Sequence, residues 1–183
     1  MSILPILLYG DPRLEQKAES VVEIGDEIRE LAKNMALTMY AAPGVGLAAP
    51  QVGVAKRMLV IDVSGGDEEG KLQTFINPEI TYREGLVRDD EGCLSFPDIV
   101  EIVERPAIVS CRALGLDGRE FTVERADGLL ARAICHEIDH LDGVLLTDRV
   151  NAFRRAMIKK KVRRKVKAGE WVAEPAHARA AAL

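Results

Sequence analysis

The sequence predicts an α+β fold with largely antiparallel β-sheets, and three observations carry this prediction. The chain has 183 residues, the size of one globular domain. Two segments, residues 26–40 and 127–141, have apolar residues at helical spacing, and a basic third segment follows them. Several short β-branched segments lie between the first two, without the strand and helix alternation that indicates a parallel sheet.

The first predicted helix has its apolar residues on one face and ends at Pro43 and Gly44. The strands predicted after it cover residues 57–63, 74–76, 99–103, 107–114 and 119–124. The dipeptides that predict turns between them are Gly65-Gly66, Asn77-Pro78 and Asp117-Gly118.

The second predicted helix is the central one, around which we expect the sheets to pack. Asp127 is its expected N-cap, and Asp142 with Gly143 is its expected end. A third, basic helix is predicted from about residue 147 or 148 to about 167. Residues from 168 onward are expected to be poorly ordered.

The composition supports a buried core and indicates no export. Apolar residues make up 48% of the chain and charged residues 30%, which excludes a disordered protein. No apolar run approaches the roughly 18 residues of a membrane helix, and the first residues lack a basic leader. We therefore expect a cytoplasmic protein without membrane contact. Three cysteines in such a protein indicate free thiols or a metal ligand, not a disulfide framework.

The sharpest chemical signal is the segment His136-Glu137-Ile138-Asp139-His140. Residues four apart lie one turn above each other on a helix, so both imidazoles can reach one divalent metal. Glu137 then lies beside that metal, where it can exchange protons with a water molecule. The segment predicts a metal centre, but zinc peptidases use the same arrangement, so the reaction stays open.

A catalytic metal usually has three protein ligands and one open position, so a third ligand is needed. Cys93 is the favoured candidate because it lies in a Gly-bearing segment that can present a side chain to a site. Cys111 lies in an alternating apolar strand, which is typical of a buried structural thiol. Cys135 projects about 100° away from His136, and His177 lies in the tail, where a solvated side chain is expected.

The segment from Gly44 to Gln51 is rich in small residues, which permit a ligand to approach the backbone closely. Gln51 offers an amide donor for a developing oxyanion. Taken alone, the segment favours an ordinary Gly/Ala-rich loop that leaves a helix.

Together, three motifs in this order resemble the peptide deformylase family. They are Gly-x-Gly-Leu-Ala-Ala-Pro-Gln at 44–51, Glu-Gly-Cys-Leu-Ser at 91–95 and His-Glu-x-x-His at 136–140. The similarity extends from about residue 3 to 150 and includes residues 11–14, and the basic helix resembles the extension of bacterial members. It implies a catalytic domain at 1–147 and a basic helical extension at 148–183 with a flexible end.

Two positions depart from the family pattern. Cys135 stands where members commonly have Gln, and Asp98 follows Pro97 where many have Gly. These departures leave open the oxidation sensitivity near the metal helix and the shape of the loop after Phe96.

The resemblance implies removal of the formyl group from the N-terminal formylmethionine of nascent chains, with release of formate. It implies that Cys93, His136 and His140 bind the metal. Glu137 is then the general acid/base, and Gln51 with the backbone N–H of Leu94 stabilises the oxyanion. One divalent metal is expected: Fe(II), which members typically use, although Zn, Ni or Co can occupy such a site.

The substrate's methionine side chain needs an apolar slot beside the metal. The candidate lining residues are Val45, Leu129 and Ala133, for which an ordinary core role is equally open. The backbone around Gly46 and Gly92 can pair with the peptide as an added strand. Glu91 and Arg105 occupy positions that pair in the family, and their pairing would hold the Cys93 loop in place.

Charge is distributed unevenly along the chain. Residues 1–150 have 15 Lys+Arg and 27 Asp+Glu, a balance of −12, whereas residues 154–167 have nine Lys or Arg and no acid. This density favours a polyanionic partner over a merely solvated helix face. For a deformylase the expected partner is the ribosome, and DNA binding is not expected.

Two other function classes share part of this residue pattern. A zinc endopeptidase would use the same helix, but it usually takes its third ligand from a downstream His or Glu. A non-catalytic RNA-binding protein would hold a structural metal, but such sites are normally closed by four protein ligands, and only three are clear in this chain.

Overall fold

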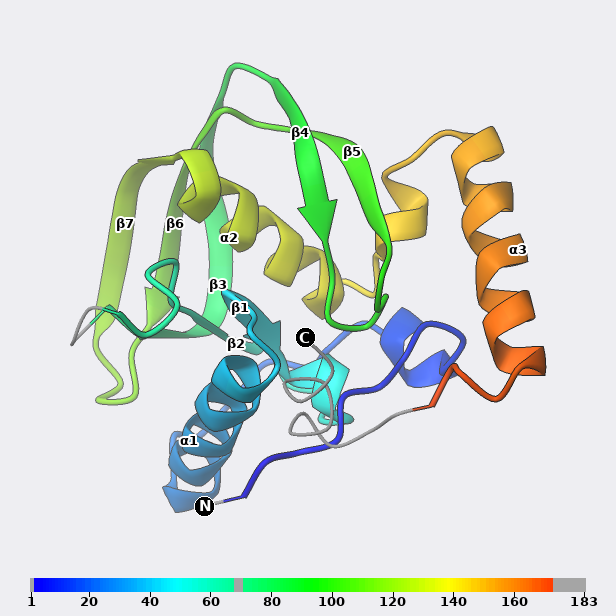
Figure 1. Cartoon of the computed structure of the whole chain (residues 1–183). Helices are drawn as coiled ribbons and strands as arrows, with labels where there is room; N and C mark the ends of the chain where they lie inside the picture. Colours follow the sequence, from blue (N-terminus) through cyan, green and yellow to red (C-terminus); the bar gives the residue numbers. More distant parts are fainter. Residues whose placement is uncertain (1, 68–70, 173–183) are drawn as a thin grey trace.

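Helix α2 lies between a five-stranded and a two-stranded antiparallel sheet in the computed structural model, which describes residues 2–67 and 71–172 (Figure 1). α2 spans Gly128–Leu141. The larger sheet has the order β1 (Gly46–Ala48), β2 (Met58–Ile61), β3 (Gln73–Glu84), β6 (Ile108–Leu114) and β7 (Glu120–Asp127). The smaller sheet is the hairpin of β4 (Val87–Gly92) and β5 (Val100–Arg105). The predicted α+β fold class is therefore confirmed.

Two further helices flank this central arrangement. α1 (Asp26–Ala41) packs against β1 and β2, with Met35 and Met39 buried against Leu47 and Met58. α3 (Ala152–Lys167) lies beyond β5, on the opposite side of the hairpin from β7 (Figure 1). Three single-turn 3-10 helices complete the described part of the chain: η1 (Pro12–Glu15), η2 (Ala49–Val52) and η3 (Leu146–Asp148).

The position of α2 is set by its apolar face and by its C-terminal end. Ile134 and Leu141 pack with Phe75 of the larger sheet in one core cluster. At the C-terminal end, Gly143 has φ +71°, and a Cβ there would lie 2.5 Å from the carbonyl oxygen of Glu15. Only glycine fits this position, because the chain turns back directly against η1.

The sequence predictions locate most elements but err at Asn77-Pro78. The predicted strand 74–76 is part of β3, which continues to Glu84, and the predicted turn is wrong. Asn77 has φ +50°, and the β3–β6 register shifts between Ile76 and Glu79, so this dipeptide forms a bulge inside the strand. Its amide side chain also bonds the backbone N–H and C=O of Val21, both at 2.9 Å, which satisfies both polar ends.

Other differences between the predicted and the observed strands and helix ends have local causes. β1 and β4 were not predicted as strands, because β1 is short and rich in small residues and β4 is almost entirely polar. Asp127 occupies the N-cap position of α2 but makes no side-chain capping bond. α3 begins at Ala152, later than predicted, because the Asn151 side chain caps it by accepting from the Arg154 N–H.

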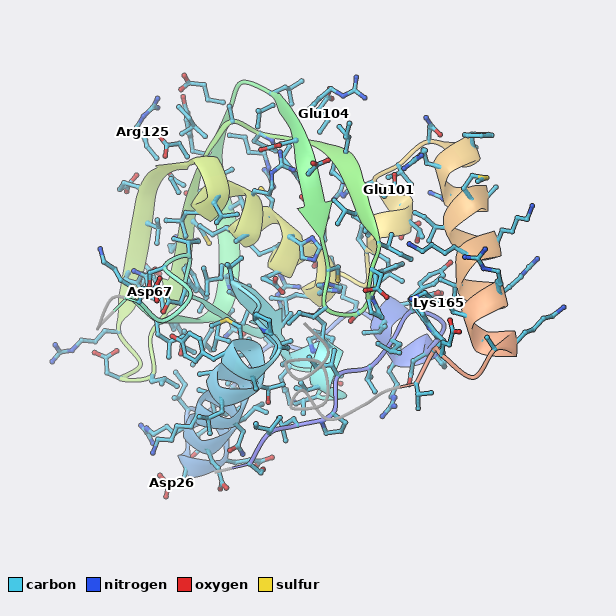
Figure 2. The ribbon with its side chains drawn as sticks, in the orientation of Figure 1. Asp26, Asp67, Glu101, Glu104, Arg125 and Lys165 are labelled. Atoms are coloured by element: carbon cyan, nitrogen blue, oxygen red, sulfur yellow. The ribbon has the colours of Figure 1, made fainter. Side chains whose placement is uncertain are left out.

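The basic helix α3 is packed onto the body of the protein. Ile158 and Val162 are buried in a cluster with Phe96 and Ile99. Arg154 Nε donates to Glu101 at 2.7 Å, and Lys165 Nζ donates to the Asp98 carboxylate at 2.5 Å. Figure 2 shows Glu101 on the side of β5 that faces α3 and Lys165 on the side of α3 that faces the body.

The division of the chain at residue 147 stays a prediction. The expected flexible end falls partly on residues 173–183, which lie outside the described residues. Before them, the Trp171 indole donates to the Tyr9 carbonyl at 3.0 Å. Within residues 2–67 and 71–172, none of the helices combines the length and apolar character needed to cross a bilayer.

The loop after β2 is anchored by the buried carboxylate of Asp62. Tyr40 Oη donates to Asp62 at 2.6 Å, and Ser64 donates from its N–H and its hydroxyl. Burial opposes the charged form of Asp62, but these hydrogen bonds outweigh burial and lower its pKa. Burial and the bond to Asp62 raise the pKa of Tyr40 to about 12.

We expect Tyr40→Phe to lower the free energy of unfolding by about 1–2 kcal/mol at pH 8, because Asp62 loses a donor. Since folding raises the Tyr40 pKa, this contribution is complete below pH 10 and is lost as pH rises toward 12. Urea unfolding of both proteins from pH 8 to 11 measures the difference. Tyr82→Phe, at an exposed tyrosine, is the control. A difference that does not shrink with rising pH would contradict this account.

Candidate metal centre and active site

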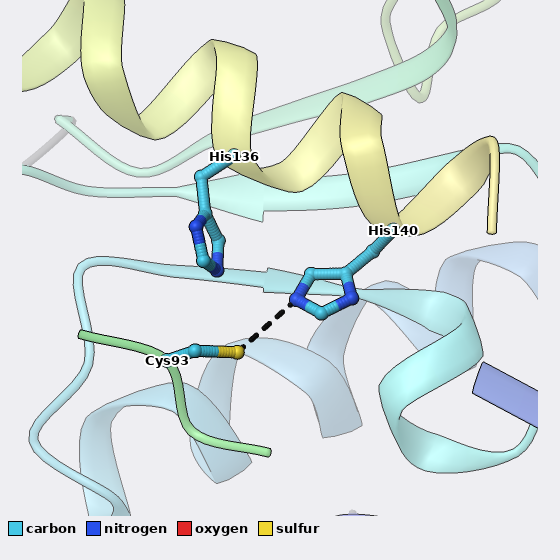
Figure 3. Close-up of side chains that lie close together, drawn as sticks. All are labelled: Cys93, His136 and His140. Atoms are coloured by element: carbon cyan, nitrogen blue, oxygen red, sulfur yellow. Dashed lines mark hydrogen bonds between the residues drawn. The ribbon is translucent and has the colours of Figure 1, made fainter. Parts of the chain in front are cut away.

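Three side chains from two elements converge beside α2. His136 and His140 lie one turn apart on α2, and Cys93 follows directly after β4. Figure 3 shows both imidazoles reaching from the helix toward the thiol. Cys93 Sγ lies 3.2 Å from His140 Nε2, and the ligand atoms of the three residues all lie within 4.8 Å of one another.

This donor set suits a divalent transition metal. A thiolate with two imidazoles is a ligand combination found at catalytic zinc sites and is compatible with other borderline metals such as Fe(II), Ni and Co. Among the described residues, this is the group of His, Cys, Asp or Glu side chains that could hold a metal ion. With three protein ligands, a fourth position is left for water or substrate.

Next to this group of three residues, the carboxylate of Glu91 connects β4 to α2. Its Oε1 lies 2.7 Å from His136 Nδ1. Arg105 donates to both carboxylate oxygens, at 2.6 and 3.0 Å, and Arg132 Nη1 donates to Oε2 at 3.0 Å. Burial alone would raise the pKa of Glu91, but the bonds to His136 and Arg105 outweigh it and lower this pKa below its ordinary value. The ionised Glu91 therefore orients the His136 ring.

The same network continues to Asp139, one residue before the second histidine. Arg105 Nη1 donates to Asp139 Oδ2 at 2.6 Å, and Arg149 Nε donates to the same oxygen at 2.8 Å. Arg105 thus joins two buried carboxylates, one on β4 and one on α2. Asp139 thereby anchors the helix that bears the histidines to β5 and to Arg149.

Glu137 lies against the Gly-rich segment of β1. A Cβ on Gly46 would lie 2.5 Å from Glu137 Oε1, so the close approach requires glycine. The other carboxylate oxygen, Oε2, is buried without a hydrogen-bond partner among the described residues. Burial raises the pKa of Glu137 to about 7. A carboxyl group in this environment can take up and release a proton.

Gln51 is held with its amide nitrogen toward the Cys93 thiol. Its Oε1 accepts from the Ala48 N–H at 2.8 Å, which fixes the orientation of the amide. Its Nε2 donates to Ser95 Oγ at 3.2 Å and lies 3.7 Å from Cys93 Sγ. Leu94, the other residue predicted to stabilise the oxyanion, follows Cys93 in the chain and lines a cavity beside these residues.

A cavity of about 450 Å³ opens beside these residues. All five predicted substrate-binding residues line it: Val45, Gly46, Gly92, Leu129 and Ala133. His136, Glu137 and Gln51 also reach its wall. Within residues 2–67 and 71–172, β1 is an edge strand of the larger sheet and β4 pairs with β5 alone, so both strands have an edge without a neighbouring strand.

Sequence reasoning missed Arg132, Ser95 and Arg149. Arg132 precedes His136 by four residues and therefore lies on the same face of α2, which is a signal that could have identified it. Ser95 and Arg149 act through tertiary contacts to Gln51 and Asp139 that no local pattern indicates.

Cys111 and Cys135 are buried free thiols outside the group formed by Cys93, His136 and His140, and burial raises the pKa of Cys111 to about 12. The predicted solvated His177 lies outside the described residues.

Comparisons with known proteins identify one family. The family model described as polypeptide deformylase matches residues 3–156. The chain is 48% identical over 171 residues to a peptide deformylase of Acidobacterium capsulatum, covering 93% of this chain and 100% of that protein.

Solved structures agree with this match. A Legionella pneumophila peptide deformylase superposes with TM-score 0.85 at 38% identity, covering 91% of this chain and 97% of that one. The Synechococcus elongatus enzyme, solved in complex with actinonin, superposes with TM-score 0.82 at 44% identity, covering 88% and 87%.

We expect Arg105→Ala to destabilise the fold by about 3 kcal/mol or more, because it leaves Glu91 and Asp139 with fewer partners in the interior. Bound metal should also dissociate at least about tenfold faster, since His136 loses its orienting support. Urea unfolding and transfer of the metal to a colorimetric chelator measure the two effects. Arg112→Ala, which breaks a half-exposed pair with Glu79, is the control. An unchanged metal off-rate would refute the supporting role of Arg105.

Proposed function

The chain belongs to the peptide deformylase family, and from this membership we propose how its residues divide the work of deformylation. The reaction is hydrolysis of the formamide at the N-terminal formylmethionine of a nascent chain, which yields formate and a free amine. The zinc endopeptidase alternative is not favoured, because the family match and the solved structures are all deformylases.

One observation carries the assignment of roles. The donor atoms of Cys93, His136 and His140 converge beside the cavity that Glu137 lines, and Glu137 Oε2 is buried without a hydrogen-bond partner among the described residues. We assign the three converging residues as metal ligands. A divalent metal held there would supply Lewis-acid activation of water and of the formyl oxygen.

Glu137 is the proposed general acid/base. It follows the proposed ligand His136 in the helix, and no donor among the described residues engages its Oε2 and would compete with a substrate or a water molecule. Glu137 accepts a proton as water adds to the formyl carbon. It then delivers that proton to the amine nitrogen as the C–N bond breaks.

Gln51 and the backbone N–H of Leu94 are the proposed donors to the oxyanion that forms on the formyl oxygen. A flip of the Gln51 amide group would break the hydrogen bond that its Oε1 accepts from the Ala48 N–H. Its Nε2 is therefore held toward Cys93 before any substrate arrives. Such preorganised donors need no rearrangement during the reaction.

The methionine side chain is proposed to enter the cavity, between Val45 on one side and Leu129 with Ala133 on the other. The peptide that follows is proposed to lie as an added strand between the free edges of β1, near Gly46, and β4, near Gly92. Backbone pairing tolerates most side chains, which suits an enzyme for nascent chains.

We expect anaerobically purified, Fe(II)-loaded protein to release formate from a formyl-Met tripeptide with every peptide bond left intact. Glu137→Gln should lower kcat by about 100-fold or more, because the acid/base group is lost while its size is kept. Formate assay and peptide mass spectrometry follow the reaction. Glu104→Gln, on the exposed face of the hairpin, is the matched control. Internal cleavage of the peptide would instead reveal an endopeptidase.

Fe(II) is the proposed native metal, and Zn, Ni or Co are the alternatives. The thiolate of Cys93 donates more charge than a third imidazole would, which makes the metal a softer Lewis acid. Metal analysis of protein purified without added metal distinguishes these ions.

We also propose that α3 binds the ribosome and that the protein is cytoplasmic, where nascent chains are made. Lys159, Lys160, Arg163 and Arg164 are exposed on α3. No ion pair within the described residues engages these four, unlike Arg154 and Lys165. They form a cationic face, which we call the outer face of α3, suited to a polyanionic surface.

We expect glutamine at all four outer-face positions to weaken ribosome binding at least about tenfold and to reduce its salt dependence. Deformylation of short peptides should be unchanged, because these side chains do not line the cavity. Truncation is a poorer test, since it would uncover the core cluster around Phe96. The matched control replaces four exposed cations of the body with glutamine: Lys17, Lys33, Arg88 and Arg119. Equal ribosome affinity of the two variants would end the proposal.

A further inference from the structure

Arg132 is a charged residue in the wall of a cavity proposed to receive an apolar side chain. It lies on α2 between Leu129 and His136, and only 7% of its surface is exposed. Leu129 and Ala133, the proposed lining of the methionine slot, are its neighbours in the same wall. The slot is therefore not purely apolar.

The guanidinium of Arg132 is only partly engaged by the protein. Nη1 donates to Glu91 Oε2 at 3.0 Å and to the Val103 carbonyl at 3.2 Å, which holds the group in place. Nη2 is buried and has no hydrogen-bond partner among the described residues. Buried donors are nearly always paired, so the unpaired Nη2 calls for an acceptor that the described residues do not supply.

We propose that Arg132 determines side-chain selectivity at the first residue of the substrate, by donating from Nη2 to an acceptor near the end of that side chain. The inference rests on the proposed function. Norleucine, methionine and methionine sulfoxide have nearly equal length but differ in this acceptor. Norleucine has none, the thioether sulfur of methionine is weak, and the sulfoxide oxygen is strong.

The cavity then takes a further substrate class, formylated peptides that begin with oxidised methionine. The reaction at the formyl group is the same hydrolysis: water adds to the formyl carbon, the C–N bond breaks, and formate and a free amine are released. The sulfoxide itself is neither reduced nor oxidised.

The ratio of reaction rates between substrates separates this role of Arg132 from a structural one. Arg132 also supports Glu91, so replacing it can disturb the metal ligands. Such damage lowers the rate for all three substrates alike, because each reacts at the same centre. Loss of a hydrogen bond from Nη2 lowers the rate only for substrates that carry an acceptor.

The experiment measures kcat/KM for formate release from formyl-Met, formyl-methionine-sulfoxide and formyl-norleucine tripeptides of otherwise equal sequence. Arg132→Lys keeps a cation for Glu91 but lacks the second nitrogen. We expect the sulfoxide-to-norleucine ratio of kcat/KM to fall about tenfold in this variant, the effect of one hydrogen bond from a charged donor. The methionine-to-norleucine ratio should fall less.

The control is Arg105→Lys, at a second arginine that binds Glu91 but does not line the cavity. It should lower all three rates and leave their ratios unchanged. The same sulfoxide-to-norleucine ratio in the wild type and Arg132→Lys would overturn the role of Arg132. Absence of formate release from all three peptides by the wild type would instead overturn the proposed function, and the inference with it.

Discussion

The site depends on a single buried carboxylate, Glu91, which joins the small hairpin to the central helix. A carboxylate in the interior is costly unless several donors compensate for lost water. Glu91 has three such partners, His136, Arg105 and Arg132. Because Glu91 precedes Cys93 by two residues, the contact that orients one proposed ligand also places another. The ligand geometry is thus a consequence of how β4 is docked on α2.

The β4–β5 hairpin contributes a second buried carboxylate next to Glu91. Glu101 of β5 pairs directly with Glu91 across the two strands, and both side chains are buried. Like charges in opposed positions destabilise a sheet unless each is neutralised. The protein neutralises them from opposite sides: Glu91 with arginines on β5 and α2, and Glu101 with Arg154 of α3. Both helices therefore contribute cations that compensate the buried carboxylates of the hairpin.

Local sequence patterns predicted the parts of the fold that local physics determines. Helical periodicity located α1 and α2 to within a residue or two at most ends, and His136, Glu137 and His140 could be recognised because their spacing is helical. β4 was missed since its buried face carries Glu91, whose partners are at least 14 residues away in the chain. The turn predicted at Asn77-Pro78 was wrong for a similar reason, because the Asn77 amide forms its hydrogen bond with the backbone of Val21, 56 residues earlier.

The single tryptophan of the chain connects through two neighbouring residues to the wall of the cavity. Trp171 donates to the Tyr9 carbonyl, and the Tyr9 ring stacks on Phe96 with centroids 4.6 Å apart. Phe96 lines the cavity, and Ile158 and Val162 of α3 lie in the same cluster. The protein therefore contains an intrinsic fluorophore at the junction of the basic helix and the cavity wall. Its emission offers an optical readout, without any added label, of whether these two parts move together.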